Sequence, residues 1–328
     1  MRISAGSSKS AATTRRSNNP SLKDLLVTLA DENYVDQAKA VFSSVYFNAG
    51  WEGTYMLLAC HIPEGRLVWF RDRGILVKEC EPLYSDTAWA QRIVDRKFAA
   101  VHPLSVTESA KCYLFSSEFK VWRTVVMLDG DVLVKSSLDR LTKVKGFAAV
   151  NDPSHSLLDQ FPREAHPEII KQLDSRYDLR QDAFNAGIFS FSTEIIREET
   201  FSEIKNLFDT YFSFSAYGTQ PVLNLYFYGH WEKLSRIYNV FPSGLGKVPA
   251  AVLHFAGPQK PWIFGNTFHE EWKSYRDRSE LIQVNEFRPF SFRKKMLEKL
   301  KIFCWNLELG LRVLFKPRSR NQAKDPPL

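Results

Sequence analysis

The sequence predicts a doubly wound α/β fold, and two observations carry that prediction. Short apolar runs typical of strands alternate along the chain with segments of helical periodicity, as in sheets that have helices on their faces. The run VVML at 125–128 has no polar alternation, which is typical of a strand covered on both sides in a parallel sheet. Ligands of such folds bind at the carboxyl ends of the strands, so functional residues are expected there.

The first half of the chain supplies most of this alternation. Its clearest helix, 35–47, has Ala38, Val41 and Val45 on one face at spacings of three and four residues. In chain order we predict a strand at 25–29, the helix at 35–47, strands at 55–60 and 75–77, a helix at 107–122 and the strand that ends at Asp129.

The second half adds further strands and helices. Thr193 is a candidate helix cap, and Pro221 is tolerated in the first turn of a helix. The second half of 182–192 alternates as a half-buried strand does. In order, we predict strands at 147–150 and within 182–192, helices at 193–212 and 219–228, and a last strand at 251–258 that a Gly-Pro pair breaks.

The formal charge of +7 belongs to the two ends of the chain. Residues 293–320 hold nine Lys and Arg against two Glu, a net of +7, while residues 1–21 are also basic. The body between them is slightly acidic, which argues against a uniformly basic surface, so no nucleic-acid partner is expected. We expect tails at 1–21 and 317–328 and one domain over 22–290.

The basic C-terminal segment leaves two interpretations open. Apolar residues recur at helical spacing over 291–316 between Lys and Arg. This pattern fits a helix that lies at the membrane surface and is attracted to anionic lipid, and equally a helix packed on the domain. Peripheral membrane contact through 293–320 is therefore an alternative, not a requirement.

Cysteine spacing and the absence of long apolar runs predict a cytoplasmic location, with the inner membrane surface as the alternative. No apolar run approaches the ~20 residues that span a bilayer, and the N-terminus lacks the apolar core of a secretory signal. Cys60, Cys80, Cys112 and Cys304 are distant in sequence and form no C-x-x-C pair. This spacing favours reduced thiols over a disulfide framework or a zinc ribbon.

Two carboxylates separated by one glycine follow the strand at 125–128. Residues i and i+2 of an extended segment point the same way, so Asp129 and Asp131 can converge on one ion. Burying two carboxylates is costly without a cation, and Gly130 lets a ligand approach the backbone closely. A hard divalent metal that carries phosphate oxygens fits best. The alternative is an acidic turn, because D-G is a common turn signal.

Six motifs in one order give the chain a family resemblance. Residues 25 to about 262 resemble the retaining glycosyltransferases that include glycogenin and bacterial lipopolysaccharide galactosyltransferases, the glycosyltransferase family 8 type. Each motif alone is weak, and the six together are specific. The matching stretches are VTL at 27–29 with Tyr34, Lys111-x-x-x-Phe115, Asp129-Gly130-Asp131, Asn185-Ala186-Gly187-Ile188, QPVLN at 220–224 and HFAGPQKPW at 254–262.

The resemblance implies a single Rossmann-like, glycosyltransferase A-type fold with a mixed, mostly parallel central sheet and helices on both faces. It also implies that Asp129, Asp131 and His254 hold one Mn²⁺, with Mg²⁺ as an alternative, which binds the diphosphate of a UDP-sugar donor. Two carboxylates and an imidazole suit Mn²⁺ better than Ca²⁺ or structural zinc. Gly257 and Lys260 would approach the phosphates by backbone and ammonium.

The same resemblance assigns the rest of the donor site. Lys111 would lie near the donor sugar and phosphates, although its match needs a two-residue insertion before Asp129, and Gln220 would lie on the reacting face of the sugar. The uridine would contact Leu29, Ala30, Asp31 and Tyr34, and the sugar would contact the small-residue strand Asn185, Ala186 and Gly187.

One position departs from the family pattern. The family usually has an aspartate immediately before the glutamine that aligns with Gln220, and this chain has Thr219. That aspartate contacts hydroxyls of the donor sugar in the family and is a candidate in the retaining mechanism. Asp152 or Asp182 is a candidate for the missing carboxylate. The tyrosine that is self-glucosylated in glycogenin has no evident counterpart.

The expected reaction is transfer of a hexose from a UDP-sugar to a hydroxyl of a glycan, lipid-linked sugar or small molecule, with retention at the anomeric carbon. The metal and Lys260 would stabilise the departing UDP. One alternative is a phosphatase of the haloacid-dehalogenase type using Asp129 and Asp131, although its motif wants Thr or Val where Leu133 stands. Another is a non-catalytic relative that binds sugar nucleotides.

Overall fold

The computed structural model describes residues 22–85, 87–88, 106–161, 167–215, 217–244, 249–284 and 300. Apart from position 300, the predicted helix at 291–316 lies outside these residues, and so do both predicted tails and Cys304. None of the described helices is long and apolar enough to cross a bilayer.

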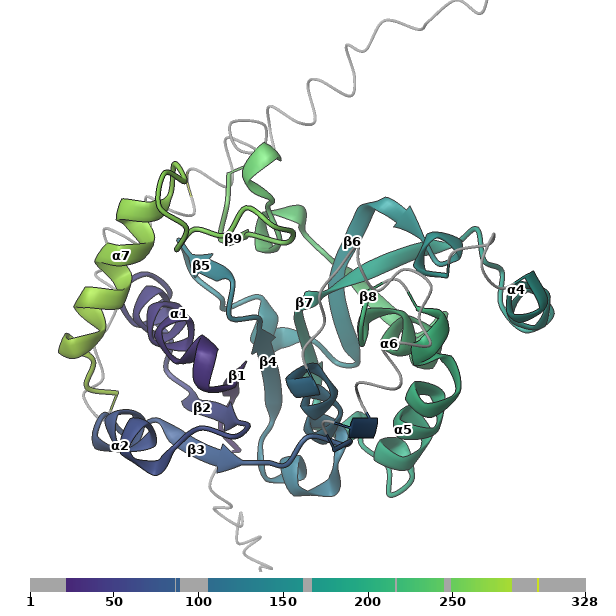
Figure 1. Ribbon diagram of the computed structural model, residues 1–328, viewed down its shortest axis with the longest axis horizontal. Coiled ribbons are helices and arrows are strands. Elements are labelled where there is room, and N and C mark those ends of the chain that lie inside the picture. The colour runs from purple at the N-terminus through teal and green to yellow at the C-terminus, as the bar shows by residue number, and fades with distance from the viewer. Residues whose placement is uncertain are drawn as a thin grey trace, which may run out of the picture.

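A seven-stranded sheet forms the centre of the fold, with the strand order β3-β2-β1-β4-β7-β6-β8 (Figure 1). Among these strands β7 runs antiparallel to both of its neighbours, and the other pairs are parallel. The predicted mixed, mostly parallel sheet is confirmed. The strands are β1 (Leu25–Ala30), β2 (Thr54–Ala59), β3 (Leu76–Glu79), β4 (Thr124–Leu128), β6 (Phe147–Ser156), β7 (Asp182–Ser192) and β8 (Trp231–Leu234).

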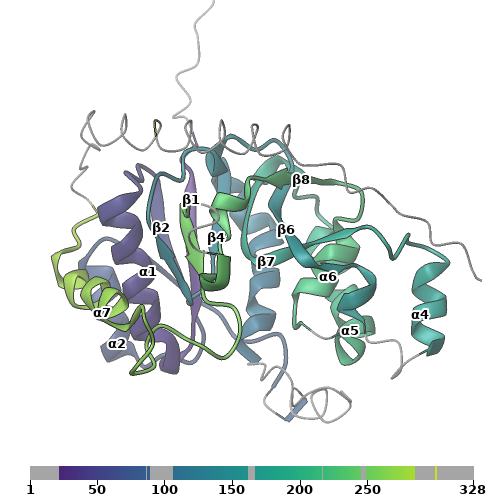
Figure 2. The same cartoon turned by 90° about the horizontal axis from the view of Figure 1, so that it is seen from above.

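Helices cover both faces of the sheet, as predicted (Figure 2). One face carries α1 (Val35–Asn48) and α2 (Glu64–Asp72), with α7 (His269–Arg278) packed against α1. The other face carries α5 (Thr200–Tyr211) and α6 (Gln220–Tyr226), together with two 3₁₀ segments, Val106–Phe115 and Ser117–Val121. The helix α4 (Pro167–Asp174) lies beyond α5 and α6 (Figure 1).

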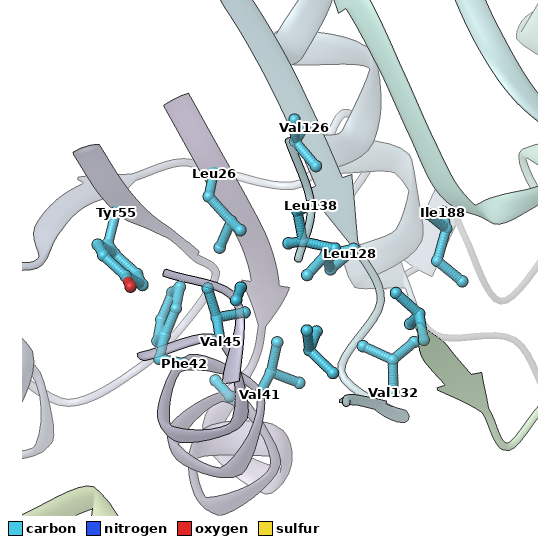
Figure 3. Close-up of a cluster of buried hydrophobic side chains, with 14 of the residues drawn as sticks. Leu26, Val41, Phe42, Val45, Tyr55, Val126, Leu128, Val132, Leu138 and Ile188 are labelled. Atoms are coloured by element: carbon cyan, nitrogen blue, oxygen red, sulfur yellow. The ribbon is translucent and has the colours of Figure 1, made fainter. Parts of the chain in front are cut away.

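The predicted helix at 35–47 is confirmed as α1, and its apolar face explains why it packs on the sheet. Val41, Phe42 and Val45 point at side chains of β1 and β2, including Leu26 and Tyr55 (Figure 3). The Phe42 ring meets the Tyr55 ring edge to face, at 5.9 Å between centroids. Removing such a buried ring typically costs about 3–5 kcal/mol, so this cluster holds α1 and the start of the site in place.

Three predicted elements differ from the structure in their bounds or in their type. The helix expected from Thr193 begins at Thr200, because Ser192 accepts the Glu194 N–H and caps a separate 3₁₀ turn first. The segment expected as a helix at 107–122 is the pair of 3₁₀ helices. The strand expected to end at 150 continues to Ser156 through register shifts against β7, so Asp152 lies within a strand.

Two further expectations about strands differ from the structure. The strand β7 is buried on both faces after its first residue, not half-buried, because its side chains enter the apolar cores on both sides of the sheet. The last predicted strand is only β9 (Val252–His254), and it joins β5 (Val132–Val134) in a separate two-stranded sheet. That small sheet places His254 opposite Val132, next to Asp131.

Two cysteines that are distant in sequence meet in space. Cys60 and Cys80 directly follow the neighbouring parallel strands β2 and β3, and their Sγ atoms lie 3.4 Å apart. Cys60, Cys80 and Cys112 are all free thiols. Sequence spacing alone did not reveal this pair because the two positions become neighbours only through the sheet register.

Candidate active site

The two carboxylates and the histidine converge because β4 and the small sheet meet at Gly130. The strand β4 ends at Leu128, Asp129 follows it, and β5 begins directly after Asp131. In the antiparallel small sheet Val132 pairs with His254, so the last residue of β9 lies beside Asp131. One potential ligand atom from each of Asp129, Asp131 and His254 lies within 4.8 Å of the others.

These three residues fit a divalent cation. Asp131 Oδ1 is buried without a hydrogen-bond partner, although His254 Nε2 lies 3.3 Å away. A Cβ atom added at Gly187 would lie 2.3 Å from His254 Cε1, so the imidazole occupies space that only glycine leaves. Two carboxylate oxygens and one imidazole nitrogen form a donor set that suits Mn²⁺.

Two lysines neutralise the carboxylates. Lys111 Nζ lies 2.6 Å from Asp129 Oδ1, and Lys260 Nζ lies 2.6 Å from Asp131 Oδ2. Lys260 Nζ also donates to the carbonyl of Phe255 at 3.0 Å. Both pairs are therefore charge-assisted hydrogen bonds, about twice as strong as neutral ones.

The pKa directions of Lys111 and Asp131 favour the charged form of each. Burial by itself would lower the pKa of Lys111, which is 7% exposed, but Asp129 and Glu108 outweigh burial and raise that pKa. Burial would raise the pKa of Asp131, but His254 in its protonated form and Lys260 hold that pKa well below its usual range. The site thus carries two ammonium groups next to two carboxylates.

A cavity of about 470 Å³ opens beside these charges. Its size falls within the range of small-molecule sites. The predicted residues that line it are Leu29, Ala30, Asp31, Tyr34, Lys111, Asp129, Gly130, Asp131, Gly257 and Lys260, and Thr107, Glu108 and Pro258 complete the lining.

The first strand and the turn after it supply the part of this lining that lies away from the two lysines. Asp31 follows β1, and its carboxylate accepts the Asn33 N–H at 3.0 Å and the Thr107 hydroxyl at 3.0 Å, which fixes the turn into α1. Tyr34 meets Trp262 edge to face at 5.6 Å. Burial, followed by the charges of Asp131, Asp31 and Asp129, raises the pKa of Tyr34 to about 12.

The remaining predicted residues lie outside the lining of this cavity. His254 is buried behind Asp131, and Gly187 contacts its ring. Asn185, Ala186 and Gln220 are also buried, and Gln220 Oε1 accepts hydrogen bonds from Asn185 Nδ2 at 3.1 Å and the Ala186 N–H at 3.0 Å. The structure therefore brings these residues together on the side of His254 away from the cavity.

The departure at Thr219 lies at the start of α6, where Thr219 is buried. Of the two candidate replacements, Asp182 is exposed and pairs with Lys233 at 2.6 Å. Asp152 is buried on β6, and its charge acts on Tyr217, where it adds to burial in raising the pKa of that phenol. Asp152 is thus the candidate that lies near the start of α6.

Sequence reasoning missed Glu108, Thr107, Gln160 and Asn239. Glu108 precedes Lys111 by one 3₁₀ turn, in which residues three apart eclipse one another, so this spacing was an available signal. Gln160 and Asn239 form hydrogen bonds with predicted residues that are distant in sequence. Gln160 accepts one from Gln220, and Asn239 bonds both Asn185 and His254. No sequence pattern marked them.

Comparisons with known proteins agree with this architecture. A model of the family described as glycosyl transferase family 8 matches residues 25–264. Glycosyltransferase GlyB of Streptococcus pneumoniae serotype 4 (strain ATCC BAA-334 / TIGR4) is 27% identical over 208 residues, which are 56% of this chain and 46% of GlyB. Glycogenin-1 of Mus musculus is 27% identical over 190 residues, 53% of this chain and 43% of glycogenin-1.

The chain thus spans less than half the length of these two relatives. Galactinol synthase 2 of Arabidopsis thaliana is 24% identical over 254 residues, 68% of this chain and 67% of the synthase.

A solved structure shows the same fold. The galactosyltransferase LgtC, crystallised with donor and acceptor sugar analogs, superposes with a TM-score of 0.60 at 20% identity, over 77% of this chain and 95% of LgtC. The predicted glycosyltransferase A-type fold is therefore confirmed, and the phosphatase alternative loses its support. The chain belongs to glycosyltransferase family 8.

Proposed function

We propose that the protein is a metal-dependent retaining hexosyltransferase that uses a UDP-sugar donor and a hydroxyl acceptor. The convergence of Asp129, Asp131 and His254 next to Lys111 and Lys260 carries this proposal. Within the described ranges this is the one group of three or more His, Cys, Asp and Glu with metal-ligand spacing. Related proteins named as a galactosyltransferase and as galactinol synthase support a hexose as the transferred group.

Asp129, Asp131 and His254 would hold Mn²⁺ or Mg²⁺. When bound, the cation supplies Lewis-acid stabilisation of a diphosphate leaving group. Lys111 and Lys260 place two ammonium groups at the same end of the cavity, where they bind phosphate oxygens once these compete with the carboxylates. Gly257 has a φ of +98° and no Cβ, which lets its backbone approach a phosphate closely.

The wall of the cavity at the end of β1 would bind the nucleoside. Leu29 and Ala30 end β1, Asp31 follows it, and Tyr34 lines the same cavity. An aromatic ring can stack on a base, and the raised pKa of Tyr34 keeps its phenol neutral over a wider pH range than in free tyrosine. This division into a nucleoside end and a diphosphate end matches the shape of a UDP-sugar.

The reaction would break the bond between the anomeric carbon and the β-phosphate oxygen and form one from that carbon to the acceptor oxygen on the same face. The departing phosphate oxygen would take the acceptor proton. Gln220 Oε1 already accepts two hydrogen bonds, which supports a role in positioning the sugar end and not in attack. The buried Asp152 is the proposed replacement for the family carboxylate that is missing at Thr219.

The test is release of UDP by the full chain from UDP-glucose, UDP-galactose, UDP-N-acetylglucosamine and UDP-glucuronate, without added acceptor. We expect release from at least one donor with Mn²⁺, loss of release with EDTA and recovery when Mn²⁺ is added back. Failure to release UDP from any of these donors overturns the transferase proposal. Thermal stabilisation by UDP without release would instead establish the non-catalytic alternative.

The acceptor would be a glycan, a lipid-linked sugar or a small molecule, met in the cytoplasm. The net charge of +7 over 293–320 supports peripheral contact with anionic lipid at the inner membrane surface. Sedimentation with phosphatidylserine vesicles tests this contact. Binding that falls with added salt is expected, and equal recovery with neutral vesicles would contradict it.

A further inference from the structure

A continuous chain of side-chain amides leads away from His254. We call Asn239, Asn185, Gln220 and Gln160 the amide chain. His254 Nδ1 lies 2.8 Å from Asn239 Oδ1, and Asn239 Nδ2 lies 2.9 Å from Asn185 Oδ1. Asn185 Nδ2 lies 3.1 Å from Gln220 Oε1, and Gln220 Nε2 lies 2.9 Å from Gln160 Oε1. The candidate metal ligand is thereby linked to the helix α6.

Two backbone N–H groups decide which way these amides point. The oxygen and nitrogen of an amide side chain have nearly the same shape, so its orientation must follow from its partners. The Gly187 N–H donates to Asn185 Oδ1 at 3.0 Å, and the Ala186 N–H donates to Gln220 Oε1 at 3.0 Å. Since a backbone N–H can only donate, turning either amide over would set two donors against each other.

The orientation then passes along the chain to the imidazole. Because Asn185 presents its oxygen, Asn239 must present its amino group to it, and the Asn239 oxygen then faces His254 Nδ1. The neutral ring therefore keeps its proton on Nδ1, because Asn239 Oδ1 at 2.8 Å is the nearer acceptor, whereas Asp131 Oδ1 lies 3.3 Å from Nε2 and its carboxylate already pairs with Lys260. The lone pair is left on Nε2, which lies 3.3 Å from the unpartnered Asp131 Oδ1.

We propose that the backbone of β7, acting through Asn185 and Asn239, sets the tautomer of His254 so that Nε2 is free to bind a divalent cation. The metal part of this inference rests on the proposed function, whereas the tautomer does not. Asn185 and Asn239 are positioning residues, because they act through His254. Gly187 contributes in two ways: its N–H orients the Asn185 amide, and its lack of a Cβ leaves room for the His254 ring.

The inference changes the role expected for Asn185. Its oxygen accepts from both Gly187 and Asn239, and its amino group donates to Gln220, so the strongest contacts of its amide are already made. Asn185 is also buried. Its main role is therefore to connect Gln220 to Asn239 and, through Asn239, to His254. A contact with the donor sugar is not needed to explain why an asparagine stands here.

The direct test is ¹⁵N NMR of the metal-free full chain labelled at histidine, at a pH at which the ring is neutral. The signal of His254 is assigned by its disappearance in His254→Gln. We expect the proton on Nδ1. A proton on Nε2 overturns the inference, whether or not the enzyme is active.

Variants test the transmission through the amides. Asn239→Leu and Asn185→Leu are expected to give a mixture of the two tautomers and to raise the Kd for Mn²⁺ about 10-fold or more, as for other residues that orient a metal ligand. Asn239→Asp keeps an acceptor for Nδ1 and should restore the Nδ1–H form. Unchanged tautomer and Kd in both leucine variants would overturn the inference and leave the proposed function intact.

Asn224→Leu is the matched control. Asn224 is a buried asparagine on α6 whose amide bonds the backbone of Phe184 and the carbonyl of Gln220, outside the amide chain. It should lose stability without changing the His254 tautomer. Conversely, an Nδ1–H tautomer in a wild-type chain that binds no Mn²⁺ would support the inference and count against the proposed function.

Discussion

Two regions of the candidate site, the proposed diphosphate end and the amide chain behind it, differ in charge and in what holds them in place. The diphosphate end consists of ionised groups, with Lys111 paired to Asp129 and Lys260 paired to Asp131. The amide chain behind it is neutral and is oriented by backbone N–H groups. Charged groups act over several ångströms and tolerate movement, whereas amides act only at contact. The first region is thus suited to binding and the second to orienting.

This comparison ranks the expected effects of substitution, and the largest belongs to Asp131→Asn. The change removes the charge of a carboxylate whose Oδ1 is buried without a hydrogen-bond partner. We expect UDP release to fall about 10²-fold or more, because the charge that holds the leaving group is lost. The exposed Asp139→Asn is the control and should keep full activity. Equal rates for the two variants would contradict the role of the diphosphate end.

Gly187→Ala should have the next largest effect and tests where the two regions meet. The new Cβ would lie 2.3 Å from His254 Cε1, so the ring must move and the Kd for Mn²⁺ should rise about 10-fold or more. Overpacking of this kind costs about 1–3 kcal/mol of stability. Gly146→Ala, whose Cβ meets nothing within 4 Å, is the control. Wild-type Mn²⁺ affinity in Gly187→Ala would show that the ring position does not matter.

Lys260→Met should have a smaller effect on the diphosphate end. It removes one of two ammonium groups and leaves Lys111 in place, so the Kd for UDP in the presence of Mn²⁺ should rise about 10-fold, the loss of one charge-assisted hydrogen bond. Lys205→Met, which breaks the half-buried pair with Asp209 and the cation–π contact with Tyr84, both away from the cavity lining, should leave the Kd unchanged. Calorimetric titration separates these outcomes, and tighter UDP binding in Lys260→Met would refute the assignment.

The smallest effect is expected at Tyr34 and appears only at high pH. Its pKa is about 12 in the folded state and 10.0 in a free tyrosine, so the unfolded chain loses the proton first. Stability should therefore be unaffected below pH 10 and should fall between pH 10 and 12. Urea unfolding across this range should show a weaker decline for Tyr34→Phe than for the wild type. An identical pH dependence would mean that Tyr34 titrates normally.

The same contrast explains what could be predicted from the sequence. The sheet, α1 and the charged residues Asp129 and Asp131 follow from local patterns, because apolar periodicity and a costly pair of buried charges are visible in a few adjacent letters. Asn239 and Gln160 could not be found this way. Each is recognised as part of the site only because its side-chain amide lies within 3 Å of a residue that is distant in sequence. Only the folded structure shows that contact.

The small sheet is the intermediate case. Only its second half, 252–254, lies within a predicted strand; the strand at 132–134 and its pairing with 252–254 were not predicted. That pairing is what brings His254 to Asp131. The family resemblance implied the meeting of these residues, and the register of β5 and β9 gives its physical cause.

The central claim is that Asp129, Asp131 and His254 form one cation site that binds a nucleoside diphosphate. The most direct test is Mn²⁺ titration followed by the electron paramagnetic resonance signal of the free ion, with and without UDP. The account predicts one Mn²⁺ per chain, tighter binding with UDP, and loss of the site in Asp131→Asn. Mn²⁺ binding that is absent, or that is equal in the wild type and in Asp131→Asn, would contradict it.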